Sequence, residues 1–170
     1  MAQAKDGVIE SLLSFMDEAF ERGSWHGPNL RGALRGVSAA GAAWRPAPGR
    51  HSIWELAIHC AYWKYAVWRR LTGTKRGSFP REGSNWFAAP EPATEQAWRQ
   101  DLVLLGQWHR RLRAEVAGLN AAALGRKSRG SRQTNGRLVR GIAAHDLYHA
   151  GQVQLLKRLA PAAALRPEAL

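Results

Sequence analysis

Two histidines four residues apart, His145 and His149, have the spacing of a metal-binding pair on a helix. Side chains at positions i and i+4 of a helix project from the same face, one turn apart. Both imidazoles can therefore reach one metal ion, as in other helical His-x-x-x-His sites. Apolar residues surround the pair, so it is expected to face a core. Two histidines alone indicate a metal only weakly, because a buried histidine that hydrogen-bonds to a carbonyl is commoner, and a third ligand would change the odds.

His59 is the predicted third ligand, because it lies in an apolar segment that must pack against the helix of His145 and His149. Three neutral imidazoles leave a fourth position for water or substrate, which is typical of catalytic zinc-type sites. Structural sites fill all four positions, usually with thiolates, and the single cysteine, Cys60, cannot supply that set. Helix geometry turns Cys60 about 100° away from His59, so it is predicted to fill the core.

Four further polar residues are candidates for roles around the three histidines. Asp146 occupies the position that a general-base glutamate takes in zincins, so it is interpreted as a base or an orienting group, or else as a solvated or capping carboxylate. Glu55 and Gln152 lie one turn from the presumed ligands and are predicted to hold ring N–H groups. Glu55 also fits a capping box with Ser52. His26 is a second catalytic candidate that could approach from its turn, with a surface position as the alternative.

The composition is that of a globular protein with an unusual positive charge. The chain has 170 residues, 45% of them hydrophobic, and a formal charge of +12 from 25 Lys and Arg against 13 Asp and Glu. The charge indicates either a solvated surface or affinity for an acidic partner. The solvated surface is favoured, since no nucleic-acid motif accompanies the charge, and binding to random duplex DNA is expected to be weak and to vanish with salt.

Compartment and domain organisation follow from the same numbers. A single cysteine excludes an internal disulfide and suits a reducing cytoplasm. No apolar run approaches the roughly 20 residues of a membrane span, and Glu10 interrupts the only candidate signal segment. One domain is expected over residues 1–160, followed by a frayed tail over residues 161–170.

Hydrophobic periodicity predicts an all-α fold, a four-helix bundle with one long crossover loop. The main helices are expected over residues 8–20, 53–71, 95–117 and 137–159, a short helix over residues 29–37, and irregular chain over residues 118–136. The crossover, residues 73–93, has no period and carries Trp86 and Phe87. Its aromatic residues are interpreted either as a wall of a binding site or as a plug for one end of the core.

Several motifs together resemble those of the DinB-like metal-binding bundles. They are Ser-Ile-Trp-Glu-Leu-Ala-Ile-His at 52–59 with Tyr62-Trp63, His-Asp-Leu-Tyr-His-Ala-Gly-Gln at 145–152, Trp-His-Gly-Pro at 25–28 and Trp-Arg-Pro at 44–46. The resemblance implies a four-helix bundle that holds a divalent metal, nickel or zinc, at His59, His145 and His149. It also implies frequent homodimers, and relatives that are thiol-dependent transferases or isomerases, or hydrolases.

The residues and the resemblance together predict a cytoplasmic metal-dependent enzyme acting on a small molecule. Transfer of a low-molecular-weight thiol is preferred to hydrolysis, because a thiol ionises far more easily than water and no convincing general base is found. The alternative is a non-catalytic metal-binding bundle whose basic surface meets an acidic partner. A homodimer is expected because eight tryptophans exceed what one small bundle readily buries.

Overall fold

The computed structural model describes residues 7–128 and 130–161, in which helices are joined by loops. The long helices are α1 (Gly7–Phe20), α4 (Ile53–Thr72), α5 (Glu95–Ala117) and α7 (Asn135–Leu159), and the short ones are α2 (Leu30–Leu34), α3 (Ala39–Ala43) and α6 (Ala121–Leu124). Within these described ranges the only extended pairing is an isolated bridge between Lys127 and Thr134. The prediction of an all-α fold is confirmed.

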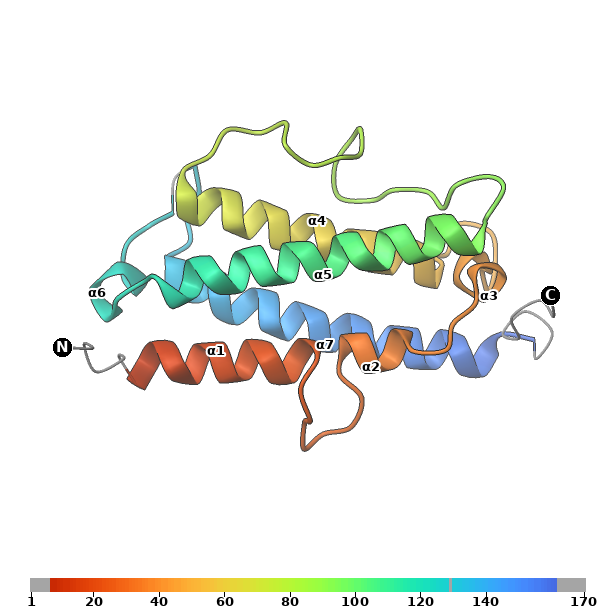
Figure 1. The fold of residues 1–170 in the computed structure, drawn as a ribbon, viewed down its shortest axis with the longest axis horizontal. Coiled ribbons are helices and arrows are strands. Elements are labelled where there is room, and N and C mark those ends of the chain that lie inside the picture. Colours follow the sequence, from red (N-terminus) through yellow and green to blue (C-terminus); the bar gives the residue numbers. More distant parts are fainter. Residues whose placement is uncertain (1–6, 129, 162–170) are drawn as a thin grey trace.

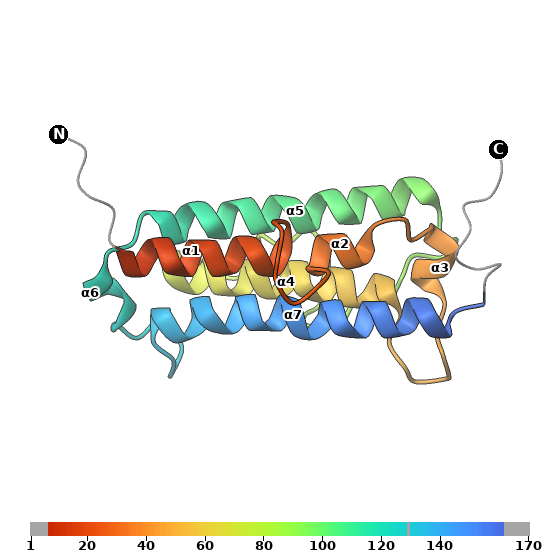
Figure 2. The same cartoon turned by 90° about the horizontal axis from the view of Figure 1, so that it is seen from below.

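The long helices pack side by side as a bundle, with α4 against both α5 and α7, and α1 against the same two helices (Figures 1 and 2). The metal-ligand candidates lie on α4 and α7, which share one edge of the bundle. Helix α2 continues the row of α1 after an intervening loop and packs on α7. The crossover between α4 and α5 runs back along α4, on the outside of the bundle (Figure 1).

Capping residues explain where the helices that carry the site begin and end. Ser52 accepts a hydrogen bond from the backbone N–H of Glu55, whose carboxylate accepts one from the backbone N–H of Ser52, which is the predicted capping box. Gly73 ends α4 in the left-handed conformation (φ 73°), which glycine adopts without steric cost. Thr94 caps α5, which begins at Glu95 as predicted. Thr134 caps α7, which therefore begins two residues earlier than expected.

Two short helices were not predicted: α6 lies where irregular chain was expected, and α3 lies in a segment for which no element was predicted. Helix α3 begins after Ser38, whose hydroxyl accepts a hydrogen bond from Gly41 N, and α6 begins after Asn120, whose side chain accepts one from Ala123 N. Both helices consist largely of alanine, which gives a weak amphipathic pattern. Their N-cap residues were the usable signal.

The core contains tryptophans at one end and an ion pair at the centre. Trp54 and Trp98 are buried, with their indole N–H groups donating to Asp101 and to the carbonyl of Val37. Lys64 of α4 and Asp146 of α7, each 1% exposed, form a salt bridge. This salt bridge joins α4 to α7 beside the histidines. Both charged groups are buried away from water, so each depends on the other to compensate its charge.

Most of the tryptophans are packed within the bundle, which weakens the argument for a dimer from their number. Trp25 is 99% exposed and Trp86 36% exposed, and the other tryptophans are buried or partly buried. None of the helices in the described part of the chain is both long and apolar enough to cross a membrane. The predicted frayed tail lies outside the described residues except for Pro161.

Candidate metal centre

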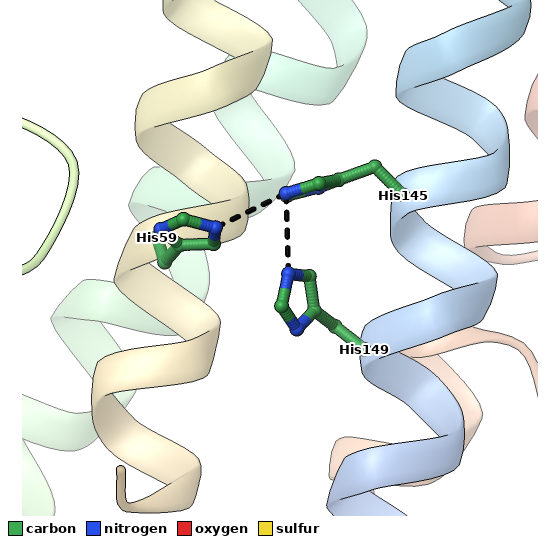
Figure 3. Close-up of side chains that lie close together, drawn as sticks. All are labelled: His59, His145 and His149. Carbon is green, nitrogen blue, oxygen red and sulfur yellow. Dashed lines mark hydrogen bonds between the residues drawn. The ribbon is translucent and has the colours of Figure 1, made fainter.

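The three predicted ligands meet at the interface of α4 and α7 (Figure 3). His145 Nε2 lies 3.1 Å from His59 Nε2 and 3.1 Å from His149 Nε2. One ligand atom of each histidine lies within 4.8 Å of the others. The spacing of one helical turn therefore directs two rings from α7 toward the ring that α4 supplies.

Hydrogen bonds at the far side of two rings fix which nitrogen faces the centre. His59 Nδ1 donates to the backbone carbonyl of Asn85 at 2.8 Å, and His149 Nδ1 donates to Gln152 Oε1 at 2.6 Å. A neutral imidazole carries one proton, so the Nε2 atoms of His59 and His149 present lone pairs. His145 Nε2 carries at most one proton and can satisfy only one of these two neighbours.

A divalent cation fits this donor set. The three Nε2 atoms converge, but they carry too few protons to hydrogen-bond to one another in both pairs. A cation between them would offset the repulsion of their lone pairs. In a tetrahedral zinc site with Zn–N bonds of about 2.0–2.1 Å, neighbouring ligand nitrogens lie about 3.3 Å apart. The 3.1 Å separations are close to that value. Ligating histidines also commonly donate their other ring N–H to a carbonyl or amide oxygen, as His59 and His149 do.

Burial keeps the three rings neutral. It lowers the pKa of His59 to about 4, with the Asn85 carbonyl acting in the opposite direction, and that of His145 to about 3, with His149 and His59 adding to the effect. Burial also lowers the pKa of His149, against the raising effect of its bond to Gln152. All three imidazoles are therefore neutral at neutral pH, the form that binds metal.

The crossover supplies a strap that holds His59 from outside. The indole of Trp86 lies between two imidazoles, stacked on His59 at 3.9 Å and on His51 at 3.6 Å, with interplanar angles of 11° and 9°. Asn85 adopts a positive φ of 69°, which lets its carbonyl face His59 while its side chain accepts a hydrogen bond from Trp63 Nε1 at 2.8 Å. The stacking and the hydrogen bond together fix the orientation of the His59 ring.

Replacing Trp86 by alanine is expected to weaken metal affinity about tenfold without unfolding the protein, since loss of a group that orients a ligand typically costs about 10–100-fold. Competition with a chromophoric chelator measures the change. Trp25→Ala removes the same side chain from a position that is 99% exposed and is the matched control. Equal affinities for wild type and Trp86→Ala would contradict the strap.

The other sequence-predicted residues have different outcomes. Gln152 lies at the site and accepts the His149 hydrogen bond, the contact expected of it. Glu55 bonds to none of the three ligand histidines, so the prediction that it holds a ligand ring is wrong; the imidazole beside it is that of His51, whose Nδ1 lies 3.6 Å from Glu55 Oε2. One oxygen of the Glu55 carboxylate pairs with Arg45 at 2.7 Å, and the other accepts the backbone N–H of Ser52 in the capping box. Both oxygens of Glu55 are therefore bonded at the start of α4.

The two candidates for catalysis lie in different places. Asp146 is buried and bonded to Lys64, and it lies outside the group of ligand atoms formed by the three histidines. One of its oxygens does lie within 4.8 Å of a ring nitrogen of His145, so a role as an orienting group or base stays a prediction. Burial raises its pKa to about 6, partly offset by the ammonium of Lys64. His26 is exposed in the loop between α1 and α2 and does not join the cluster. The interpretation of Asp146 as a solvated or capping carboxylate is also wrong.

Sequence reasoning missed Asn85, His51 and Lys64. An internal lysine on an otherwise apolar helix face was a readable sign of a buried ion pair, since lysine is rarely buried unless paired. Nothing in the sequence marked the Asn85 carbonyl, because any residue supplies one. Phe87 is buried in the core against Tyr62, as the interpretation of the crossover as a plug expects. Trp86 covers His59, and its role as a wall of a binding site stays a prediction.

Comparison with known proteins places this geometry in a family. The family model described as the DinB superfamily matches residues 24–153, a span that includes all three histidines, the Asn85–Trp86 strap and Gln152. No curated protein and no solved structure matches the chain. Because the family model covers more than half of the sequence, the chain belongs to the DinB superfamily.

Proposed function

We propose that this protein is a metal-dependent enzyme whose divalent ion, nickel or zinc, is held by His59, His145 and His149. One observation carries the proposal: three neutral Nε2 atoms converge, and the hydrogen bonds to Asn85 and Gln152 fix two of them as lone-pair donors. Three protein ligands leave room for an exchangeable fourth, as in catalytic sites. The family membership of the chain is in keeping with it.

The reaction that we propose is transfer of a low-molecular-weight thiol to an electrophilic acceptor. When bound, the ion would supply a Lewis acid that lowers the pKa of a thiol. The sulfur would form a bond to the electrophilic carbon, the thiol proton would pass to solvent, and the leaving group would depart with its bonding pair. Hydrolysis needs a base to assist water, and the carboxylate nearest the centre, Asp146, is bonded to Lys64 in the core.

The thiol must come from outside the chain. The only cysteine, Cys60, is buried, and burial raises the pKa of its thiol well above the usual value, with Asp146 adding to the effect. A buried thiol of high pKa is a poor nucleophile. The proposal therefore requires a compartment rich in reduced small thiols, such as the cytoplasm, and a small-molecule acceptor beside the wall that Trp86 forms.

The test supplies metal-loaded protein with electrophilic acceptors, with and without low-molecular-weight thiols, and follows conjugate formation by mass spectrometry. Conjugation should need both metal and thiol, disappear in His145→Ala, and persist in His26→Ala, which changes an exposed histidine outside the cluster. Ester or amide hydrolysis that is indifferent to thiol and lost in His145→Ala would establish the hydrolase alternative. Metal binding without turnover of any acceptor would favour the non-catalytic bundle with a basic partner-binding surface.

We also propose a homodimer, formed through an exposed face of α7. Tyr148, Leu155 and Leu159 are 65, 57 and 56% exposed and recur at a helical spacing, with the exposed Ala144 and Gly151 on the same face. Small residues between large apolar ones allow a second helix to approach closely. The resemblance to a family of frequent homodimers points the same way.

The dimer is expected to have twice the 18.8 kDa mass of the chain in light scattering at micromolar concentration. Leu155→Glu places charges opposite each other across this face and should give the monomer. Val103→Glu, which adds the same charge to an exposed valine on α5, should leave the dimer intact. A monomeric wild-type protein, or a dimer that survives Leu155→Glu, would contradict the proposed interface.

A further inference from the structure

A groove lies on the edge of the bundle opposite the metal centre. Helix α1 ends at Phe20 and α2 begins at Leu30, with a loop between them (Figure 1), and residues of α1, this loop, α2 and α5 line a cavity. The cavity there has a volume of about 1190 Å³. Pockets for small ligands are typically about 300–1,000 Å³, so the groove has room for a small molecule.

The groove has an apolar floor on α5 and in the core behind it. Leu102 is half-buried and Val103 is 56% exposed, and both line the groove together with the buried Phe20, Leu34 and Trp98. The Phe20 ring stacks on His109 at 3.9 Å, and Trp98 is held by the bond from its Nε1 to the Val37 carbonyl at 2.8 Å. A ligand resting here would contact Leu102 and Val103, and Leu102 packs against this fixed core.

The rim of the groove is strongly basic. Its charged residues are the arginines Arg22, Arg31, Arg35, Arg99 and Arg110 and the glutamates Glu21 and Glu95. Arg31 pairs with Glu21 at 2.9 Å, and Arg22 lies 3.4 Å from Asp17.

Three rim arginines, Arg35, Arg99 and Arg110, have no acidic partner among residues 7–128 and 130–161. Arg110 Nη1 lies 3.3 Å from where a β-carbon on Gly106 would stand, so its guanidinium folds back over α5 where that helix lines the groove. Three arginines without an acidic partner thus line the same groove as the apolar side chains.

We propose that this groove binds an amphiphilic organic anion: a carboxylate, sulfonate or phosphate ester on an aliphatic or aromatic body. The apolar floor takes the hydrocarbon part, and the guanidinium groups take the acid group, for which their planar donors are suited. An inorganic anion would leave the floor uncovered, and a neutral amphiphile would leave the rim charges unpaired. The site is separate from the histidine cluster and does not depend on a metal.

The experiment titrates the folded apo-protein with 1-anilinonaphthalene-8-sulfonate, whose fluorescence rises in apolar surroundings, and then competes it with decanoate. Decanoate should displace the probe, while decanol and inorganic phosphate should be at least about tenfold weaker, because each lacks one of the two required parts. The double variant Arg99→Gln with Arg110→Gln should weaken the binding of both the probe and decanoate about tenfold. Val103→Glu, an exposed change on the groove wall, should also weaken both.

The matched control is Arg137→Gln with Arg140→Gln, which removes the same charge from two exposed arginines of α7. It should leave both affinities unchanged, and circular dichroism should show that every variant is folded. If the two double variants weakened binding equally, the loss would be explained by net charge alone, and the proposed site would be overturned. Decanol binding as tightly as decanoate, no effect of Val103→Glu, or no binding of either anion would overturn it as well.

Discussion

Replacing His145 by alanine is expected to abolish stoichiometric metal binding. His145 Nε2 makes both of the 3.1 Å approaches that define the cluster, so its loss leaves His59 and His149 without the ring between them. Two imidazoles on different helices bind a divalent ion far more weakly than three, so the loss should exceed the roughly 10–100-fold that removing a supporting partner costs. Metal analysis after gel filtration, and calorimetric titration of chelator-stripped protein, measure it.

His59→Ala and His149→Ala should have the same effect, because each removes one of the same three ligand atoms. The control is His26→Ala, which should keep about one ion per chain. The helical circular dichroism of all variants should match wild type, since the long helices are joined by apolar packing outside the cluster. Undiminished metal in His145→Ala, or equal loss in His26→Ala, would show that the histidine cluster is not the site.

Replacing Lys64 by methionine is expected to destabilise the protein by about 3–5 kcal/mol, because removing one partner of a buried ion pair leaves the other charge uncompensated. Here the remaining charge is Asp146, which is 1% exposed. Urea unfolding of protein from which metal has been removed with a chelator measures the change. Lys75→Met, in the exposed part of the crossover, is the control and should lie within about 0.5 kcal/mol of wild type.

The pH dependence of this effect follows from Asp146. Its pKa in the folded protein, about 6, lies above the reference value of 3.8, so the folded state holds the proton more tightly than the unfolded state. Ionising Asp146 therefore removes stability as the pH rises from about 4 to about 6. Without the ammonium of Lys64 the pKa of folded Asp146 rises further, so this loss of stability continues to higher pH. The difference in unfolding free energy between wild type and Lys64→Met should therefore be larger at pH 8 than at pH 5.

The double variant Lys64→Met with Asp146→Leu distinguishes the ion pair from simple loss of packing. Apolar replacement of both partners of a buried pair is often neutral or stabilising, so the double variant should recover most of the stability lost in Lys64→Met. A double variant as unstable as the single one would show that the lysine stem, and not the unpaired carboxylate, explains the loss.

The sequence was sufficient for the long helices and for the convergence of the histidines, because both depend on local periodicity. The apolar stripe of residues 53–71 and the His-x-x-x-His spacing of α7 each define a face, and two such faces in one core must meet. Helix starts followed from side chains that cap them, such as Ser52 and Thr94. The prediction for Glu55 failed because two local roles competed for one carboxylate, and the capping box took it.

The support of the site could not be predicted in this way. The Asn85 carbonyl and the Trp86 stack come from a crossover without a period, and which of its residues reaches α4 depends on the path of the backbone. The partner of Asp146 depends on the rotation of α4 relative to α7, which brings Lys64 across the interface. Spacing along one helix contains no information about that rotation.

The burial of Cys60 has a practical consequence for a protein that we propose to work among electrophiles. A catalyst with an exposed thiol would be alkylated by the compounds it processes and would lose activity with each such event. Here the only sulfhydryl of the chain is buried between α4 and its neighbours and is held protonated. The protein can therefore meet alkylating compounds repeatedly while its own sulfur stays unmodified.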